Sequence, residues 1–437
     1  MMKKNPAHNI ELIFCAIGVM LIVYLTVSSF IADLVDTEQL YSNSSSENQL
    51  APPIIPGVTV DAGGLDSLYH SDTQPPRFVY TDGIYINPQA PITNKALLMF
   101  TGDLMCGYDM QKAAMSGDTF DFRACFSFVK STLELSDLTI GSLETMVSQS
   151  APYQYQQKEI PSPGGMQYNC NAPATYLEAL RYAGFDALVA ANNHNLDAGL
   201  TGITETLDNL ESYNLLYTGM FREKTDSRFL LFDINGINVA ILSYAAAFNT
   251  LDGLFDSQAL NISLNKYEQN RARADIAAAR TAGADFVMVF IHWGKQNSNT
   301  VTPSQYAYGQ ELADAGADYI IGGHPHVLNP YDILLAADGR SVPVIYSLGN
   351  FISDMSEIEY SNSDAVIWLL ELKKSADSVT IADESYIPCY IFQNLEGQRY
   401  VTVPCDSELT DINAIRELNN ARERIRRALG DKISETY

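Results

Sequence analysis

The feature that most constrains the fold is an alternation of short apolar runs with stretches of helical period, which begins near residue 95. The runs before residue 330 are KALLMF, DLTIGSL, DALVAAN, INVAILSYA, DFVMVFIHW and ADYIIGG. Helical patterns lie between most of them, at about 122–135, after Pro173, at about 201–213 and over 266–283, where Gly283 is expected to end the helix. Strands that alternate with helices form βαβ units. The sequence therefore predicts an α/β fold with a partly parallel sheet covered on both faces.

The pattern changes after residue 330, where helical stretches become rare. Further apolar runs such as VPVIYSL and AVIWLLELKK predict strands, and the scarcity of helical connections favours antiparallel pairing. The last stretch, residues 408–429, combines basic and acidic side chains with an apolar stripe. It is expected to form an amphipathic helix that packs on the surface of the domain.

The N-terminal region contains a long apolar segment, because residues 12–32 carry no charged side chain. A helix over this segment is long enough to cross the bilayer hydrocarbon, which is roughly 30 Å thick. Lys3 and Lys4 precede the segment and Asp33 follows it, which favours an anchor with its N-terminus in the cytoplasm. The alternative is a cleaved signal peptide. The anchor predicts a single-pass protein of the cell membrane whose folded part lies outside the cytoplasm.

These patterns divide the chain into segments. Residues 35–94 are rich in Ser, Asn and Pro and lack a sustained period, so they predict an extended tether with local order only near residues 77–86. The predicted organisation is a cytoplasmic tip and transmembrane anchor at 1–34, the tether at 35–94, the folded domain at 95–405 and a C-terminal helix at 406–437.

Composition excludes one class of partner. Asp and Glu number 52 against 27 Lys and Arg, and the formal net charge of −25 excludes general nucleic-acid binding, which needs a basic surface. Apolar residues make up 46% of the chain, so most of it is expected to fold. Cys389 and Cys405 flank a predicted hairpin and could pair across it, although spacing alone does not fix the connectivity.

Polar side chains stand at the carboxyl ends of the predicted βα strands. They are Asp103, Glu144, Asn193 with His194, His292, and His324 with His326. Ligands of open α/β sheets bind at this edge, where the loops converge. The other histidines, His8 and His70, precede the folded part, so every histidine expected in the domain belongs to this set. We therefore expect these side chains to converge on one edge and to form a metal site.

Imidazole, carboxylate and amide donors without a thiolate suit a borderline divalent cation. Mn²⁺, Fe²⁺ and Zn²⁺ fit such a set better than Ca²⁺ or Mg²⁺. Two ions that share a bridging carboxylate activate water and hold both oxygens of a displacement at phosphorus, whereas a single ion polarises an amide or ester carbonyl. The residues leave open whether one or two ions bind.

Several blocks of residues follow one another in a characteristic order: TGDLM, GSLET, ANNHNLDAG, IHWGKQ, GADYIIGGHPHV and YSLGNF. Together they resemble the CapA, or poly-γ-glutamate capsule synthesis, family over about residues 95–405. That family is related in fold to the calcineurin-like metallophosphoesterases, which implies a βαβ sandwich of two mixed sheets flanked by helices. Its membrane-anchored members act in making or exporting the capsule.

The resemblance also implies roles for the candidate residues. For the metal it implies the following ligands: Asp103 and His326 at a first ion, Asn193, His292 and His324 at a second, and Glu144 as the bridge. It implies further that His194 is the general acid for the leaving group and that Asp197 orients it. Asn350, in the YSLGNF block, receives no role.

The chain departs from the phosphoesterase pattern at a few positions. Met105 stands where the D-x-H block has a histidine, Ser142 where asparagine is usual, and Gln296 where an acid is usual. The first ion is therefore expected to lack one histidine ligand.

The residues and the resemblance predict a membrane-anchored, extracytoplasmic metalloprotein in the biosynthesis or export of poly-γ-glutamate capsule or another cell-envelope polymer. One alternative is a metal-dependent phosphoesterase that acts on nucleotides or envelope phosphates, and another is a non-catalytic assembly partner with the same fold. The expected partners are the membrane, other capsule-synthesis membrane proteins, and an anionic polymer or phosphate-containing substrate. An acidic protein needs a local basic patch to bind a polyanion, and Arg271, Arg273 and Arg280 are the candidates.

Overall fold

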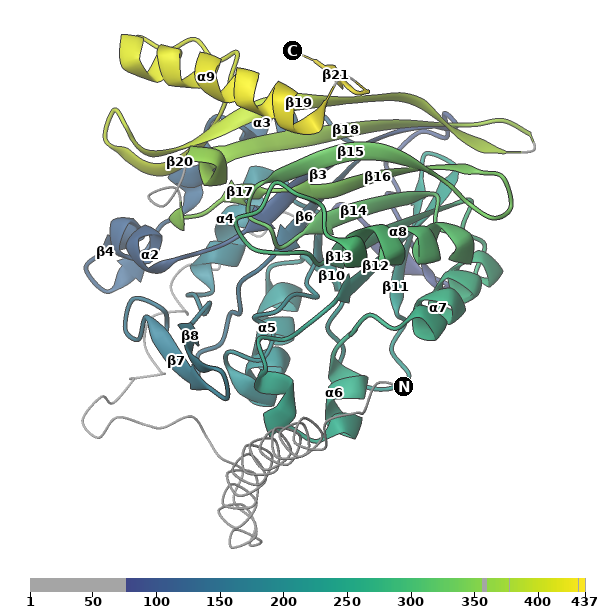
Figure 1. Ribbon diagram of the computed structural model, residues 1–437, viewed down its shortest axis with the longest axis horizontal. Helices are drawn as coiled ribbons and strands as arrows, with labels where there is room; N and C mark the ends of the chain where they lie inside the picture. The colour runs from purple at the N-terminus through teal and green to yellow at the C-terminus, as the bar shows by residue number, and fades with distance from the viewer. Residues whose placement is uncertain (1–75, 356–359, 377, 431, 437) are drawn as a thin grey trace, which may run out of the picture. The chain divides into compact units, whose positions relative to one another are not determined.

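The computed structural model describes residues 76–355, 360–376, 378–430 and 432–436, which form an α/β domain built on two mixed β-sheets (Figure 1). The anchor expected at residues 12–32 and the first part of the tether lie outside the described residues. Among the helices of the described ranges, none is both long and apolar enough to span a membrane.

The first sheet has eight strands, in the order β1 (Val79–Thr81), β2 (Ile84–Ile86), β11 (Phe229–Ile234), β12 (Ile237–Ala245), β13 (Phe286–His292), β14 (Tyr319–Gly323), β16 (Ser341–Leu348) and β15 (Leu328–Leu335). Its central strands β12, β13, β14 and β16 are parallel. The run VPVIYSL was expected to pair antiparallel, and it does so with β15 but not with β14. The difference arises because β15 occupies the sheet edge, which places β16 between β15 and a parallel neighbour.

The second sheet contains β10 (Leu216–Thr218), β9 (Ala187–Val189), β6 (Leu138–Leu143), β3 (Lys95–Leu104), β18 (Asp364–Lys374), β19 (Val379–Leu395) and β20 (Gln398–Pro404) in that order. β17 (Asn350–Ile352) also pairs with β3, and β21 (Ser434–Glu435) with β19. The strands β10, β9, β6 and β3 are parallel, whereas β18, β19 and β20 are antiparallel, as predicted for the region after residue 330.

Side chains at alternate positions of the strands fill the space between the two sheets. On β13, Met288 and Phe290 face the second sheet, while Val289 faces the opposite side. The ring of Phe290 meets that of Phe100, from β3, at a centroid distance of 6.0 Å. Each such fully buried side chain contributes about 1.5–3 kcal/mol of hydrophobic stabilisation. This shared core fixes the two sheets against each other.

The helices divide between the outer faces of the sheets (Figure 1). On the second sheet pack α2 (Tyr108–Ala114), α3 (Lys130–Leu133), α4 (Thr175–Ala183) and α5 (Gly199–Ser212), and on the first sheet α7 (Gln269–Thr281) and α8 (Pro303–Ala315). α6 (Ser257–Ser263) follows β12 in the chain, and β4 (Met115–Ser116), β5 (Thr119–Phe120), β7 (Glu159–Ser162) and β8 (Gly165–Tyr168) form two small hairpins. The helix expected over 122–135 is only a 3₁₀ turn at Arg123–Phe126 followed by α3. After α7, Gly283 takes the left-handed φ of +101° that suits a helix end.

The C-terminal helix α9 (Ile412–Leu429) lies across β15, β18 and β19 (Figure 1). Its apolar stripe is buried in the core shared by the two sheets and consists of Ala414, Leu418, Ala421, Ile425 and Leu429. A bidentate contact between Arg424 and Asp364 ties the helix to β18. The helix is thus more than the surface element expected from its pattern, because its apolar stripe completes the core.

Two expectations about the ends of the domain are changed by the structure. β1 and β2 form within residues 77–86, where local order was expected, but Phe78 is buried in the core between the sheets, so the folded part begins before residue 95. Cys389 and Cys405 are free buried thiols, as are the other cysteines of the described ranges. They do not pair because Cys389 lies opposite Pro404 rather than opposite Cys405.

Candidate metal centre

The polar strand ends come from both sheets and meet between them. From the second sheet come Asp103 in β3, Glu144 after β6, and Asn193 and His194 after β9; from the first come His292 in β13 and His324 and His326 after β14. The expectation of one shared edge is therefore corrected to two facing edges. The reason is that β3, β6 and β9 pair with one another and never with β13 or β14.

Two clusters of donor atoms share Glu144. One contains Glu144, His292 and His324, the other Asp103, Glu144 and His326, and the donor atoms within each cluster lie within 4.8 Å of one another. The Oε1 atom of Glu144 is 3.3 Å from Nε2 of His292, and its Oε2 atom is 3.7 Å from Nδ1 of His326. The structure thus brings these five predicted residues together, with Glu144 between the two groups.

Asn193 joins the cluster that contains His292. Its Oδ1 atom lies 2.7 Å from Nε2 of His292, and Nδ1 of His324 lies 3.1 Å from the same nitrogen. The orientation of the Asn193 amide is set because its Nδ2 donates to Oδ1 of Asn249 at 2.9 Å. Oxygen and nitrogen donors therefore converge on one point, which is the requirement for binding a cation.

The carboxylate of Glu144 shows that these residues fit a bound cation. Glu144 is fully buried, and neither of its oxygens has a hydrogen-bond partner in the described structure. Nδ1 of His292 also lacks a partner. A buried carboxylate without hydrogen bonds is costly unless positive charge compensates it. A divalent cation held by these residues would supply that compensation.

The protonation states of the donor side chains are also suited to binding a cation. Burial and the Glu144 charge raise the pKa of Asp103 to about 6. Burial alone would raise the pKa of Glu144, but His292 and His326 hold it below its ordinary value, so Glu144 is ionised. Burial and the neighbouring His292 lower the pKa of His324 well below 6.5, which leaves a neutral imidazole with a free lone pair.

Two glycines explain the TGD and GGH blocks. A Cβ on Gly102 would lie 2.0 Å from the carbonyl oxygen of Gly349, so only glycine lets β17 approach β3. A Cβ on Gly323 would lie 2.8 Å from Oδ1 of Asp103. His324, which follows Gly323, and His326, two residues further on, have positive φ angles of 91° and 59°. Such strained backbone is found at functional sites held by the surrounding structure.

Asn350 is a site residue to which the sequence assigned no role. It lies opposite Asp103 in the parallel pairing of β17 with β3. Its Oδ1 atom is 3.0 Å from Nδ1 of His326, and its Nδ2 donates to Ser353 Oγ and to the carbonyl of Asn362. Because both amide hydrogens are used on the far side, the oxygen points into the cluster of Asp103 and His326.

His194 lies beside the clusters and is held by Asp197. Nδ1 of His194 is 2.7 Å from Oδ2 of Asp197, and its Nε2 is 4.0 Å from Oε1 of Glu144. Burial alone would lower the pKa of His194, but Cys170 and Asp197 raise it well above 6.5. Asp197 is itself fixed by the backbone amide of Cys170 and by Gln167. The relative placement of His194 and Asp197 agrees with the sequence analysis, which gave no signal for Cys170 or Gln167.

The positions that depart from the phosphoesterase pattern surround the donors. Ser142 donates its hydroxyl to Oδ1 of Asp103 at 2.8 Å and so orients that carboxylate. Nε2 of Gln296 lies 3.4 Å from Nε2 of His326. Met105 is buried and offers neither a nitrogen nor an oxygen side-chain donor. Ser142 and Gln296 therefore contact the donors, whereas Met105 contributes none.

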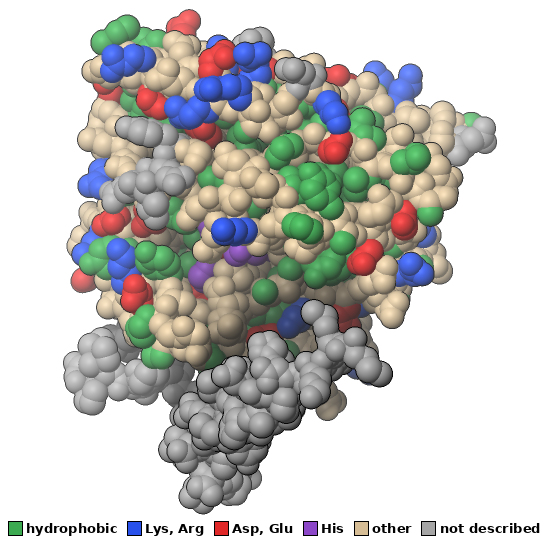
Figure 2. Space-filling model, viewed as in Figure 1, with side chains coloured by type: hydrophobic (Ala, Val, Ile, Leu, Met, Phe, Trp, Pro, Cys, Tyr) green, Lys and Arg blue, Asp and Glu red, His purple; other side chains and the backbone are tan. Residues whose placement is uncertain are grey.

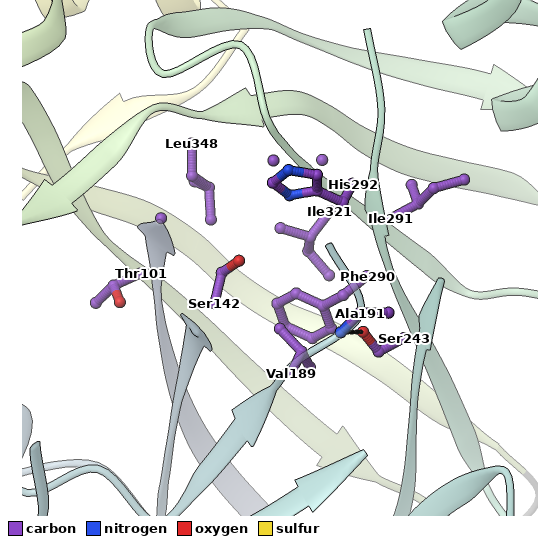
Figure 3. A pocket seen from close by; sticks show the side chains of 13 residues that line it. Thr101, Ser142, Val189, Ala191, Ser243, Phe290, Ile291, His292, Ile321 and Leu348 are labelled. Carbon is purple, nitrogen blue, oxygen red and sulfur yellow. Dashed lines mark hydrogen bonds between the residues drawn. The ribbon is translucent and has the colours of Figure 1, made fainter. Parts of the chain in front are cut away.

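The site lies between an apolar floor and the outer surface. Figure 3 shows His292 at one end of a small cavity whose other walls include Val189, Phe290 and Ile321. Histidine side chains are visible from outside on one face of the molecule (Figure 2), and His324 is the partly exposed member of the set. The apolar floor strengthens electrostatic interactions, while the open side leaves part of His324 exposed to solvent.

Comparison with known proteins finds two capsule biosynthesis proteins among the relatives of this chain. The chain is 29% identical over 264 residues to Capsule biosynthesis protein CapA of Bacillus anthracis and 28% identical over 263 residues to PGA biosynthesis protein CapA of Bacillus subtilis (strain 168). These alignments cover 60% and 58% of this chain and 60% and 62% of the relatives. The chain thus matches less than two thirds of the length of these relatives.

Solved structures with a similar arrangement have low sequence identity. One is the calcineurin-like phosphoesterase YfkN from Bacillus subtilis, with a TM-score of 0.39 and 14% identity over 76% of this chain and 99% of that chain. Another is the sulfate thiohydrolase SoxB, with a TM-score of 0.38 and 11% identity over 79% of this chain and 62% of that chain.

The family match covers the whole candidate site. Residues 97–355 match the family described as Bacterial capsule synthesis protein PGA_cap. This range is more than half of the chain and runs from β3, which carries Asp103, past β17, which carries Asn350. The chain belongs to the PGA_cap family of bacterial capsule synthesis proteins.

Proposed function

We propose that this chain is a divalent-metal-dependent protein of poly-γ-glutamate capsule biosynthesis that acts on the anionic polymer or on a phosphate-containing precursor. Family membership supports the capsule role. The observation that supports the metal role is the fully buried Glu144 carboxylate, whose oxygens lack hydrogen bonds and face histidines from both sides. A core does not keep such a group without a compensating charge.

The donor set favours Mn²⁺, Fe²⁺ or Zn²⁺, because imidazole nitrogens and carboxylate oxygens make up both clusters. The division around Glu144 favours two ions with Glu144 as the bridge. On that assignment Asn193, His292 and His324 hold one ion and Asp103 and His326 the other. When bound, the metal supplies Lewis-acid polarisation of a phosphoryl or carbonyl oxygen.

His194 is proposed to give a proton to the leaving group. Asp197 accepts the hydrogen bond from Nδ1, which leaves Nε2 directed toward the Glu144 side of the site. Cys170 and Asp197 shift the pKa of His194 upward, a direction that supports the role of proton donor. Asp197 thus acts through His194, whose orientation and charge it maintains.

The proposed place of action is the outer side of the cell membrane. The uncharged segment at residues 12–32 supports a single-pass anchor with the folded domain outside the cytoplasm. The proposed partners are the membrane and the other membrane proteins of capsule synthesis.

The test compares the full chain with its Glu144→Gln variant, which keeps the shape of the side chain but removes the charge. Bound metal is measured by mass spectrometry, and capsule formation by complementation of a strain that lacks the chain. We expect the native chain to hold metal and the variant to lose both metal and capsule. Glu205→Gln is the matched control, because Glu205 pairs with Ser148 and Ser150 away from the clusters.

Two outcomes contradict the proposal. A native chain that holds no divalent ion removes the metal role, and full capsule formation by Glu144→Gln favours the non-catalytic assembly partner. If the native chain also hydrolyses a generic phosphodiester, that second outcome favours the phosphoesterase alternative instead.

A further inference from the structure

Two arginine side chains converge on Asn261 in α6. Nη2 of Arg228 donates to the backbone oxygen of Asn261, and Nη2 of Arg271 donates to its Oδ1 atom, both at 3.2 Å. The guanidinium carbon of Arg228 lies 4.1 Å from the ring centroid of Phe221. Arg228 and Arg271, called the arginine pair below, are therefore held side by side by a stacking contact and a shared amide.

The arginine pair has donors without acceptors. The Nη1 atoms of both residues are buried and have no hydrogen-bond partner in the described structure. Among the described residues, no carboxylate forms an ion pair with either arginine within 4.0 Å. Asp275 attracts both from a longer distance, and one of its oxygens is occupied by the hydroxyl of Tyr244 at 2.9 Å. Two neighbouring positive charges with unpaired N–H groups offer hydrogen-bond donors for an anion.

The electrostatics of the pair agree with this geometry. Burial, and after it the charge of Arg271, lower the pKa of Arg228. The repulsion between the two side chains is relieved when an anion binds between them.

The arginine pair lies at the same end of the first sheet as the metal centre. Phe229, which follows Arg228 and begins β11, pairs with Leu242 near the carboxyl end of β12. Lys266, which precedes α7, bridges to Ala245 at the end of β12, and Ala245 also pairs with His292. A long substrate that reaches the histidines can therefore extend toward the pair.

We propose that the arginine pair binds an oxyanion group of the substrate, either a carboxylate of an acidic polymer or a phosphate of its precursor. This inference rests on the proposed function. Guanidinium groups match both anions through paired hydrogen bonds. A local site of this kind offsets the repulsion between a polyanion and a chain of net charge −25. The sequence analysis expected a basic patch of Arg271, Arg273 and Arg280. Only Arg271 belongs to the arginine pair, because Arg280 is paired with Asp318 and Arg273 is exposed.

The experiment measures binding of two probes to the full chain by isothermal titration. The probes are poly-γ-glutamate of defined length and inorganic phosphate. We expect Arg228→Gln and Arg271→Gln each to weaken binding about tenfold or more, because each removes a charge-assisted hydrogen bond. Arg273→Gln is the matched control, since it removes the same charge from the same helix and is expected to leave binding within about twofold of native.

The two probes separate the sources of the anion. Weaker polymer binding by the variants assigns the pair to polymer carboxylates, and weaker phosphate binding alone assigns it to a precursor phosphate. Arg228→Lys, which keeps the charge but loses the planar fork, is expected to fall between native and Arg228→Gln. Unfolding temperature and metal content of each variant confirm that the fold and the metal centre are intact.

The inference is overturned if Arg228→Gln and Arg271→Gln bind both probes as tightly as the native chain, or if the native chain binds neither probe. Neither result bears on the metal proposal, which is tested separately by the metal content of the native chain and by the effect of Glu144→Gln. Failure of the metal proposal appears instead as a native chain without metal.

Discussion

The side-chain oxygen of Asn350 lies 3.0 Å from Nδ1 of His326. This contact links β17 to the loop after β14 and places an amide oxygen beside a proposed metal ligand. The amide cannot turn away without losing its bonds to Ser353 and Asn362. Asn350 therefore either fixes His326 by hydrogen bonding or adds an oxygen donor to the cluster, and both roles support ion binding.

We predict that Asn350→Ala weakens binding of a divalent ion by about 10–100-fold, as is usual when a residue that orients a ligand is removed. Titration of the metal-free chain with Mn²⁺ and Zn²⁺ measures the affinity. Asn171→Ala is the control, because Asn171 is equally buried but its side chain bonds only to backbone atoms of residues 148–152. Equal affinity of the native and Asn350→Ala chains would show that Asn350 serves only the fold.

His194→Ala is expected to keep the metal but to lose function. Nε2 of His194 is 4.0 Å from Glu144, so the ring lies beside the donors rather than among them. Loss of a general acid typically lowers the rate by about 10²–10⁴-fold. Capsule formation by the variant, with metal analysis of the purified protein, measures both effects. Asp197→Asn is expected to give a smaller loss, and full complementation by His194→Ala would exclude the catalytic role.

The pKa of Asp103 predicts a pH dependence of ion binding. In the metal-free chain this pKa is about 6, and the ion binds only the ionised carboxylate. Affinity should therefore be nearly constant above pH 6 with respect to this group and should fall by up to about tenfold per pH unit below it. Titrations between pH 5 and pH 8 measure the slope. A flat profile across pH 6 would contradict the assignment of Asp103 as a ligand.

The raised pKa of Asp103 also affects the stability of the metal-free chain, and this stability changes with pH in the opposite direction to the ion affinity. In the metal-free chain the carboxyl of Asp103 prefers its proton in the folded state, so its contribution to stability is full below its unfolded pKa of about 3.8 and is lost as the pH rises through about 6. Bound metal removes this loss because it stabilises the ionised form.

Gly102→Ala is expected to separate β17 from β3. The new Cβ would lie 2.0 Å from the carbonyl oxygen of Gly349, so the backbone must move. We expect a loss of about 1–3 kcal/mol of stability or more, as for overpacked cores, together with weaker metal binding. Chemical unfolding measures the stability. Gly253→Ala, where a Cβ has no neighbour within 4 Å, is expected to be close to neutral.

The anchor predicts that residues 12–32 stay attached to the mature protein. Protease added to intact cells should degrade the domain from outside, and mass spectrometry of the purified protein should detect the N-terminal segment. A mature N-terminus that begins after residue 30 would instead indicate a cleaved signal peptide.

The sequence predicted several of the side chains that the structure brings together, but not how the two sheets bring them together. Apolar runs followed by polar residues predicted Asp103, Glu144 and His292 at strand ends, because that pattern is local. The pairing of β3 with β18 joins residues far apart in the chain, and no local pattern reports it. The two facing edges therefore emerged only from the structure.

The roles of Asn350 and of the arginine pair were hidden for the same reason. Asn350 becomes meaningful only when β17 lies against β3 and turns its amide toward His326. The pair joins Arg228, which precedes β11, to Arg271 in α7 through an exposed asparagine of α6. Each of these residues taken alone looks like an ordinary polar side chain.

Each donor cluster takes its residues from both sheets. An ion bound at Glu144 would therefore also cross-link the two sheets. An ion present at about 100 times its dissociation constant would add about 2.7 kcal/mol to the free energy of unfolding. By the same linkage, a substitution that lets the sheets part in the core between them, for instance at Phe100, should release the ion more readily. Heating the loaded chain would then show metal loss and unfolding as a single event.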